Sequence, residues 1–124
     1  MPGTFRNASM CEDIREEIGN KKSLMGVFSG DVLVPRFPAR FRVAFYAEYL
    51  PALGGEHEVR LSIEIGAAEA ATAQVRVNTA PGQPATLVIP QGVAQFDAPG
   101  EIILRATAED VTTELLRKSV RLAD

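Results

Sequence analysis

The chain has 124 residues, of which 46% are hydrophobic and 23% are charged. This composition is typical of a globular domain with its own core and excludes a disordered tail, so we expect residues 1–124 to form a single domain, with residues 1–8 as a possible loose N-terminal arm. The net charge of −3 offers a phosphate backbone no overall attraction, and we expect no nucleic-acid partner.

Cysteine content and hydropathy indicate the compartment. Cys11 is the single cysteine and cannot form an internal disulfide, so we expect a reducing compartment, by default the cytoplasm. The first ten residues lack the apolar run of a signal peptide. Apolar stretches elsewhere are far shorter than the roughly 20 residues that cross a bilayer, so we expect no membrane partner.

Residues 9–28 allow two interpretations. Ser9 and Glu12 have the spacing of a capping box, which would begin a two-turn helix. Alternatively, the segment Gly19-Asn20-Lys21 separates residues 9–18 from residues 22–28 as a turn separates two paired strands. We favour the hairpin.

Strict alternation of apolar and polar residues marks two segments further along. Residues 56–65 place apolar side chains at every second position, which predicts a strand with one buried face. Residues 41–49 follow the same period, and turn residues lie between the two segments, so we expect a hairpin. The residues expected in the core from residues 56–65 are Val59, Leu61, Ile63 and Ile65.

The sequence after residue 70 predicts four more strands. Residues 71–77 and 85–89 are separated by a loop, because Pro81 and Pro84 cannot donate to a sheet. Residues 102–108 and 116–122 then form a final hairpin with a turn near Asp110.

The spacing of these segments predicts the fold class. About eight short strands without a long amphipathic helix favour an all-β fold, a two-sheet antiparallel β-sandwich in which each sheet hides one apolar face. The absence of Trp and of a second Cys excludes an antibody-type domain. An immunoglobulin-like topology remains the expected arrangement.

The N-terminal motifs resemble those of a known family. They are a Cys-acid-acid segment at Cys11-Glu12-Asp13, a Gly-Asn-Lys turn, the strand Ser23-Leu24-Met25-Gly26-Val27-Phe28 and the segment Pro35-Arg36-Phe37-Pro38. In these roughly 38 residues the chain is similar to a family of small bacterial domains of unknown function. The resemblance implies a β-sandwich and a bacterial source, and it implies no activity and no functional residue.

Catalytic and metal-binding residues are not predicted. His57 lies between Glu56 and Glu58 without a second His or Cys that could complete a zinc site, so we interpret it as a solvated loop residue. Cys11 is expected to be a small buried side chain rather than a nucleophile, although Arg15 could lower its pKa. No glycine-rich phosphate loop is present, and we expect no cofactor.

One basic cluster is the candidate binding site. Arg36, Arg40 and Arg42 lie close in sequence to Phe37 and Phe41, and arginine beside exposed aromatic residues is typical of interaction hot spots. We therefore predict that Arg36, Phe37, Arg40 and Arg42 bind a partner. The alternative is that both phenylalanines belong to the core and the arginines protect an edge strand from aggregation.

Three functions follow from these observations, in order of preference. The first is a non-enzymatic protein-interaction module with a protein partner, since β-sandwiches present loops and edges. The second is a structural subunit of a larger assembly such as a phage or secretion particle. The third is a small-ligand binder or an enzyme, which requires a deep pocket.

Overall fold

The computed structural model describes residues 3–66 and 68–123, which form eleven strands and no helix. It therefore contains no helix that could cross a membrane. The all-β prediction is confirmed, whereas the predicted number of about eight strands is too low. The strands are β1 (Thr4–Glu17), β2 (Lys21–Val27), β3 (Val32–Val34), β4 (Ala39–Arg42), β5 (Ala44–Leu50), β6 (Gly55–Ile65), β7 (Ala68–Thr79), β8 (Ala85–Ile89), β9 (Val93–Phe96), β10 (Gly100–Ala108) and β11 (Val111–Leu122).

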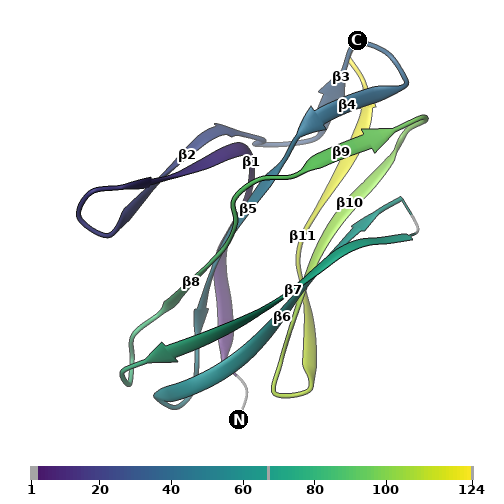
Figure 1. The fold of residues 1–124 in the computed structure, drawn as a ribbon. Helices are drawn as coiled ribbons and strands as arrows, with labels where there is room; N and C mark the ends of the chain where they lie inside the picture. Colours follow the sequence, from purple (N-terminus) through teal and green to yellow (C-terminus); the bar gives the residue numbers. More distant parts are fainter. Residues whose placement is uncertain (1–2, 67, 124) are drawn as a thin grey trace.

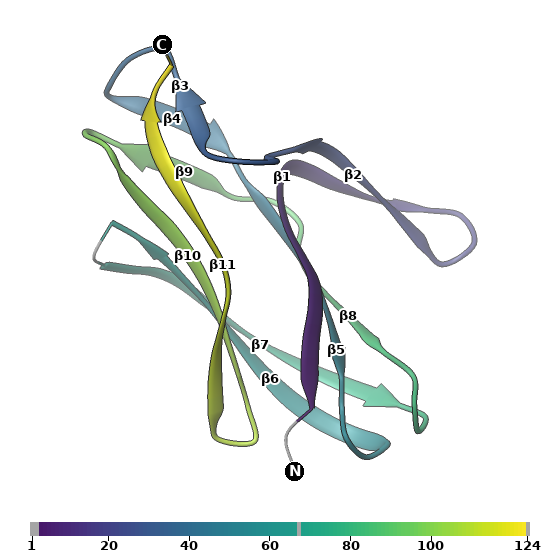
Figure 2. The same ribbon diagram turned by 180° about the vertical axis from the view of Figure 1, so that it is seen from behind.

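The strands form three sheets (Figures 1 and 2). One sheet has the order β2-β1-β5-β8, the second has the order β3-β11-β10-β6-β7, and the third contains only β4 and β9. All pairs are antiparallel except β3 and β11, which run parallel. The prediction of a wholly antiparallel pair of sheets is therefore wrong in two respects: the short third sheet and the parallel pair.

Side chains from the two larger sheets share one hydrophobic core. Phe45 and Leu87 come from the first sheet and Leu61, Ile102 and Leu104 from the second, and all are at most 2% exposed. Apolar residues at alternate positions of β6 face this core, as the periodicity predicts. Burial of this apolar surface is the main stabilising contribution to the fold.

Two predicted hairpins are confirmed, and the turn of each contains residues with positive φ angles. β1 and β2 pair antiparallel, and the turn between them has positive φ angles at Gly19 and Asn20. β10 and β11 pair antiparallel around Glu109 and Asp110, which also have positive φ. Glycine, asparagine and aspartate tolerate this left-handed region better than most residues do. Residues 10–17 are therefore strand, and the helical interpretation is wrong.

The predicted hairpin of residues 41–49 and 56–65 is wrong. β5 pairs with β1 and β8, while β6 pairs with β10 and β7, so the two segments belong to different sheets. Alternation marks a buried face in both segments, but two strands that face each other across a core show the same pattern as two strands side by side. The segment is also broken at Val43, where the chain passes from β4 to β5.

The start of the chain is ordered by pairing with β5. Thr4, Phe5 and Arg6 lie opposite Leu50, Tyr49 and Glu48. This part of the segment considered as a loose arm is therefore a strand, and residues 1 and 2 lie outside the described residues.

Candidate partner-binding groove

The predicted binding residues lie at the end of the molecule that carries β3, β4 and β9 (Figure 1). Pro35 follows β3 directly, and Arg36 and Phe37 continue the link to β4. Within β4 the side chains alternate, with Ala39 buried and Arg40 and Arg42 exposed. The two arginines of this strand therefore share the solvent face.

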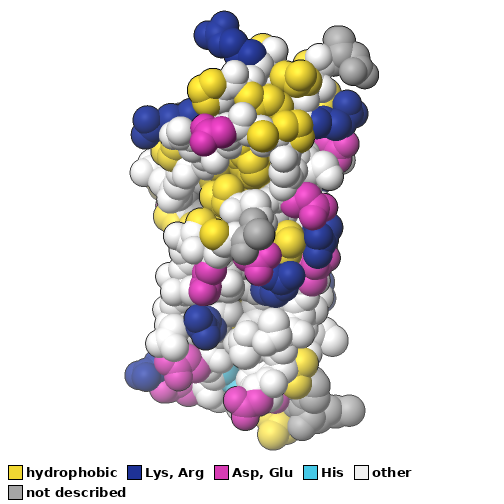
Figure 3. All heavy atoms as spheres, turned by 90° about the vertical axis from the view of Figure 1, so that its right-hand side faces the viewer, with side chains coloured by type: hydrophobic (Ala, Val, Ile, Leu, Met, Phe, Trp, Pro, Cys, Tyr) yellow, Lys and Arg dark blue, Asp and Glu magenta, His cyan; other side chains and the backbone are white. Residues whose placement is uncertain are grey.

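A groove of about 540 Å³ opens between β3 and β4. Arg36 and Arg40 lie among its lining residues, and Glu12 of β1 lines it as well. The rest of the lining is apolar. It comprises Phe28, Val32, Leu33, Val34, Pro35, Pro38, Ala39 and Phe41. Figure 3 shows that the upper end of one face of the molecule carries a broad hydrophobic patch with basic side chains at its margins.

The three arginines of this region differ from the other arginines of the described residues. Arg36, Arg40 and Arg42 have neither an ion pair nor a side-chain hydrogen bond within residues 3–66 and 68–123. Every other described arginine pairs with a carboxylate. These arginines are Arg6, Arg15, Arg60, Arg76, Arg105, Arg117 and Arg121. The guanidinium groups beside the groove are therefore available to a ligand.

Aromatic packing fixes the inner side of the groove. The ring centroids of Phe28 and Phe41 are 6.1 Å apart in an edge-on arrangement. Those of Phe41 and Phe96 are 6.2 Å apart with nearly parallel planes. Phe28 directly follows β2, so these three rings connect the C-terminal end of β2 to the β4–β9 pair. Such contacts hold apolar surface in a defined position.

Two of the predicted residues lie apart from the groove lining. Phe37 is partly buried and packs against the main core, in keeping with the alternative interpretation. Arg42 lines a neighbouring depression of about 350 Å³ together with Glu12, Asp13 and Val93. Arg36 and Arg40 are thus brought together in one groove, while Arg42 lines a separate depression that shares Glu12 with it.

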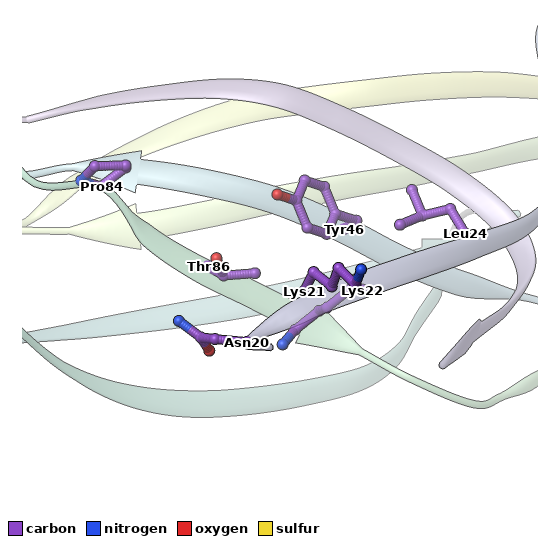
Figure 4. A pocket seen from close by; sticks show the side chains of 7 residues that line it. All are labelled: Asn20, Lys21, Lys22, Leu24, Tyr46, Pro84 and Thr86. Atoms are coloured by element: carbon purple, nitrogen blue, oxygen red, sulfur yellow. The ribbon is translucent and has the colours of Figure 1, made fainter. Parts of the chain in front are cut away.

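Another depression lies at the tip of the β1–β2 hairpin, and part of its polar lining is already paired within the chain (Figure 4). Lys21 and Lys22 lie on its hairpin side, and Tyr46 and Thr86 on the opposite side. The Lys22 Nζ is 3.0 Å from a carboxylate oxygen of Glu16. The Tyr46 hydroxyl donates a hydrogen bond of 2.7 Å to Glu48. Since two of its polar groups already have partners, we place the candidate site in the groove.

Cys11 is buried and His57 is partly buried. Cys11 is completely buried, and burial raises the pKa of its thiol. His57 lies in β6 with a side chain only 13% exposed, so its interpretation as a solvated loop residue is wrong. Its Nε2 is 2.7 Å from the carbonyl oxygen of Leu53, and its Nδ1 is 3.4 Å from Glu109. Within residues 3–66 and 68–123, no group of three or more His, Cys, Asp or Glu side chains could hold a metal ion.

Several of the residues that line the groove were not predicted from the sequence. Glu12, Phe28 and Leu33 come from segments that precede the basic cluster. Leu33 carried no usable signal, because Val32, Leu33 and Val34 are all apolar and a strand of three residues is too short to show a period. Glu12 and Phe28 carried none, since only the folding of the β1–β2 hairpin beside β3 brings them to the groove.

Comparison with known proteins identifies no family for this chain. No family model matches it, and no curated protein matches it. Among solved structures, a β-glucosidase, EmGH1, from Erythrobacter marinus aligns with 15% sequence identity and a TM-score of 0.38. The alignment covers 95% of this chain and 15% of that chain. This similarity is too weak to support a conclusion about fold or function. The resemblance to the bacterial family of unknown function stays a prediction.

Proposed function

We propose that this protein is a non-enzymatic protein-interaction module that binds a partner through the groove between β3 and β4. The observation that carries the proposal is the set of arginines beside the apolar groove, Arg36, Arg40 and Arg42, which have no carboxylate partner within residues 3–66 and 68–123. Unsatisfied guanidinium groups next to partly exposed aromatic surface are the usual composition of a binding hot spot.

We also infer that the two larger sheets form an immunoglobulin-like sandwich. The order β11-β10-β6-β7 corresponds to strands G-F-C-C′ of such domains, and β1-β5-β8 corresponds to A-B-E. Domains of this class bind partners mainly through the loops and edges at the ends of their sheets. The groove between β3 and β4 has such a position.

Cysteine content supports a location in the cytoplasm. The single cysteine, Cys11, is buried and free. A domain without disulfides is suited to a reducing compartment, and we therefore propose cytoplasmic partners.

The test is affinity capture from the source cells with the wild-type domain and with the double variant Arg36→Glu, Arg40→Glu. We expect a protein that the wild type retains and the double variant loses, because reversed charges repel an acidic surface. A matched control is Arg60→Glu, Arg76→Glu, which alters two exposed arginines on the second sheet. Circular dichroism must show that both variants remain folded.

Two outcomes would contradict the proposal. One is that no specific protein is retained, and the other is that the control variant loses the same protein as the groove variant. If the retained protein is a further copy of this chain, the domain is a subunit of an assembly instead. Light scattering would then show a particle mass that increases with the protein concentration.

A further inference from the structure

The free edge of β3 lies along the groove. β3 pairs with β11 on one side, and no strand of residues 3–66 and 68–123 pairs with it on the other. The backbone N–H of Ala123 donates a hydrogen bond of 2.9 Å to the carbonyl of Val34, so Val34 directs its backbone groups toward β11. Successive residues of a strand direct these groups to opposite edges. The N–H and C=O of Leu33 therefore point away from β11.

We propose that the groove receives one extended, acidic peptide segment of a partner protein, which adds as a strand to the free edge of β3. This inference rests on the proposed function and names the chemistry of the partner. Strand addition obtains its affinity from main-chain hydrogen bonds and its specificity from the side chains at alternate positions. Because β3 has three residues, the paired part of the peptide spans only about 10 Å.

Charge selects an acidic peptide. Arg36 and Arg40 line the groove without ion-pair partners in the described residues. Carboxylates at alternate positions of an extended peptide point to the same side, so one peptide can present two of them to this margin. Glu12 lines the groove as well and repels an acidic peptide. The carboxylates of the peptide must therefore lie beside Arg36 and Arg40 and away from Glu12.

Apolar contacts complete the recognition. Phe28 and Phe41 line the groove, and both are only partly buried by the rest of the chain. An extended peptide that places carboxylates on one side places the intervening side chains on the other. Aliphatic side chains at these positions would cover the two rings, which favours an alternation of acidic and aliphatic residues.

A nucleic-acid strand is the other anionic polymer to consider. Its phosphates could contact the arginines, but it carries no peptide N–H and C=O in strand spacing to pair with the β3 edge. The net charge of −3 repels any anionic polymer at long range, and it repels a phosphate backbone more strongly than a peptide with one carboxylate at every second residue. The free edge and the charge both favour the peptide.

The experiment is an NMR titration of the isotope-labelled domain with short synthetic peptides in which Glu alternates with Val. We expect amide shifts at Leu33 and at residues that line the groove, and a dissociation constant that rises with salt concentration. A peptide with Lys in place of Glu should not bind. A Glu-Val peptide that is N-methylated along one edge should lose at least about tenfold in affinity, because it cannot complete the strand pairing.

Protein variants locate the contacts. Arg40→Glu should weaken binding of the Glu-Val peptide about fivefold or more, whereas Arg60→Glu on the second sheet should leave it unchanged. Glu12→Gln should strengthen binding, since it removes the like charge. Equal binding of the Lys-Val peptide, unchanged affinity after N-methylation, or tighter binding of an oligothymidylate would overturn the inference.

Failure of this inference is distinguishable from failure of the proposed function. If affinity capture yields a partner that depends on Arg36 and Arg40, but the Glu-Val peptide leaves the amide of Leu33 unshifted, the module binds its partner by another mode. If capture yields no such partner, the proposed function itself fails.

Discussion

Phe41 of β4 stacks on Phe96 of β9, with ring centroids 6.2 Å apart and ring planes within 4° of parallel. This contact joins the strands of the two-stranded sheet that borders the groove. Replacing Phe41 with Leu removes both ring contacts but keeps an apolar side chain, so we expect a loss of about 1–2 kcal/mol in the free energy of unfolding. Urea denaturation measures it.

Val93→Ala in β9 provides the control for Phe41. The Val93 side chain is 54% exposed, so its truncation should cost less than about 0.5 kcal/mol. An equal cost for the two substitutions would mean that the aromatic stack contributes nothing beyond surface coverage.

Ile63 is expected to be a core residue whose truncation is costly. It lies opposite Leu104 across the β6–β10 pair and is only 8% exposed. Ile63→Ala leaves a cavity between the sheets, with an expected loss of about 2–5 kcal/mol. Thermal unfolding should show a lowered midpoint with no change of cooperativity.

Ser62 lies on the opposite face of the same strand and is the matched control. Its hydroxyl makes one exposed hydrogen bond of 3.3 Å to Glu69. Ser62→Ala should therefore change stability by less than about 0.5 kcal/mol. A costly Ser62→Ala beside a harmless Ile63→Ala would mean that the two faces of β6 are exchanged.

Periodicity predicted individual strands better than it predicted their neighbours. The buried face of β6 and the β10–β11 hairpin follow directly from apolar residues at alternate positions. The placement of β5 and β6 in different sheets could not be predicted, because alternation records burial and not pairing. Short strands such as β3 and β9 are too brief to show a period.

Alternation of apolar and polar residues also fails to predict some buried residues outside the main core. Ala44 belongs to a small cluster with Cys11 and Ile14, apart from the main core. Ile103 is 5% exposed although the neighbouring Ile102 and Leu104 occupy the main core. Their burial depends on long-range contacts with other elements. Local alternation assigns such positions to the solvent face.

The candidate site was predicted in part for the same reason. Arg36 and Arg40 could be proposed from composition alone, because arginine beside phenylalanine is unusual on an ordinary surface. That these arginines lack carboxylate partners in the described part of the chain depends on the positions of acidic residues far away in sequence. Only the folded structure shows which arginines are paired.

Cys11 should behave as a packing residue. It is buried, and burial raises the pKa of its thiol, so the native protein should react with a disulfide reagent at least about tenfold more slowly than the unfolded protein. Cys11→Ala should cost about 1 kcal/mol in stability and leave partner binding intact. Lost binding with an unchanged melting temperature would assign the thiol a functional role.

Glu48 should give the stability a dependence on acid pH. Hydrogen bonds from the Tyr46 hydroxyl, the Asn7 amide and the Arg6 guanidinium lower the pKa of this carboxyl from its ordinary value of 4.5. A lowered pKa in the folded state means that the carboxylate stabilises the fold above pH 4.5 and that this contribution is lost as the pH falls through the lower value.

The variant Glu48→Gln isolates this contribution. It should be about 1 kcal/mol less stable than the wild type at pH 7, and the difference should shrink as the pH falls below the ordinary glutamate pKa of 4.5. Thermal unfolding at several pH values measures it. A difference that stayed constant down to acid pH would show that the charge of Glu48 does not contribute.

Arg40 and Arg105 should differ sharply in their contribution to stability. Arg105 forms ion pairs with Glu64 and Glu114 across neighbouring strands, and its side chain is only 31% exposed. Arg105→Ala should therefore cost about 1 kcal/mol, after allowance for screening by solvent. Arg40 has no ion pair in the described residues, and Arg40→Ala should change stability by less than about 0.5 kcal/mol.

Binding should show the reverse order for these two arginines. Arg40→Ala should weaken partner binding because the side chain lines the groove. Arg105 of β10 does not line the groove but a separate depression with Arg60 and Glu64, so its loss should leave binding unchanged. Denaturation curves and affinity capture on the same two variants separate the roles. If Arg40→Ala destabilised the fold as much as Arg105→Ala did, Arg40 would have a structural partner, and the argument that this arginine is held available for a ligand would fail.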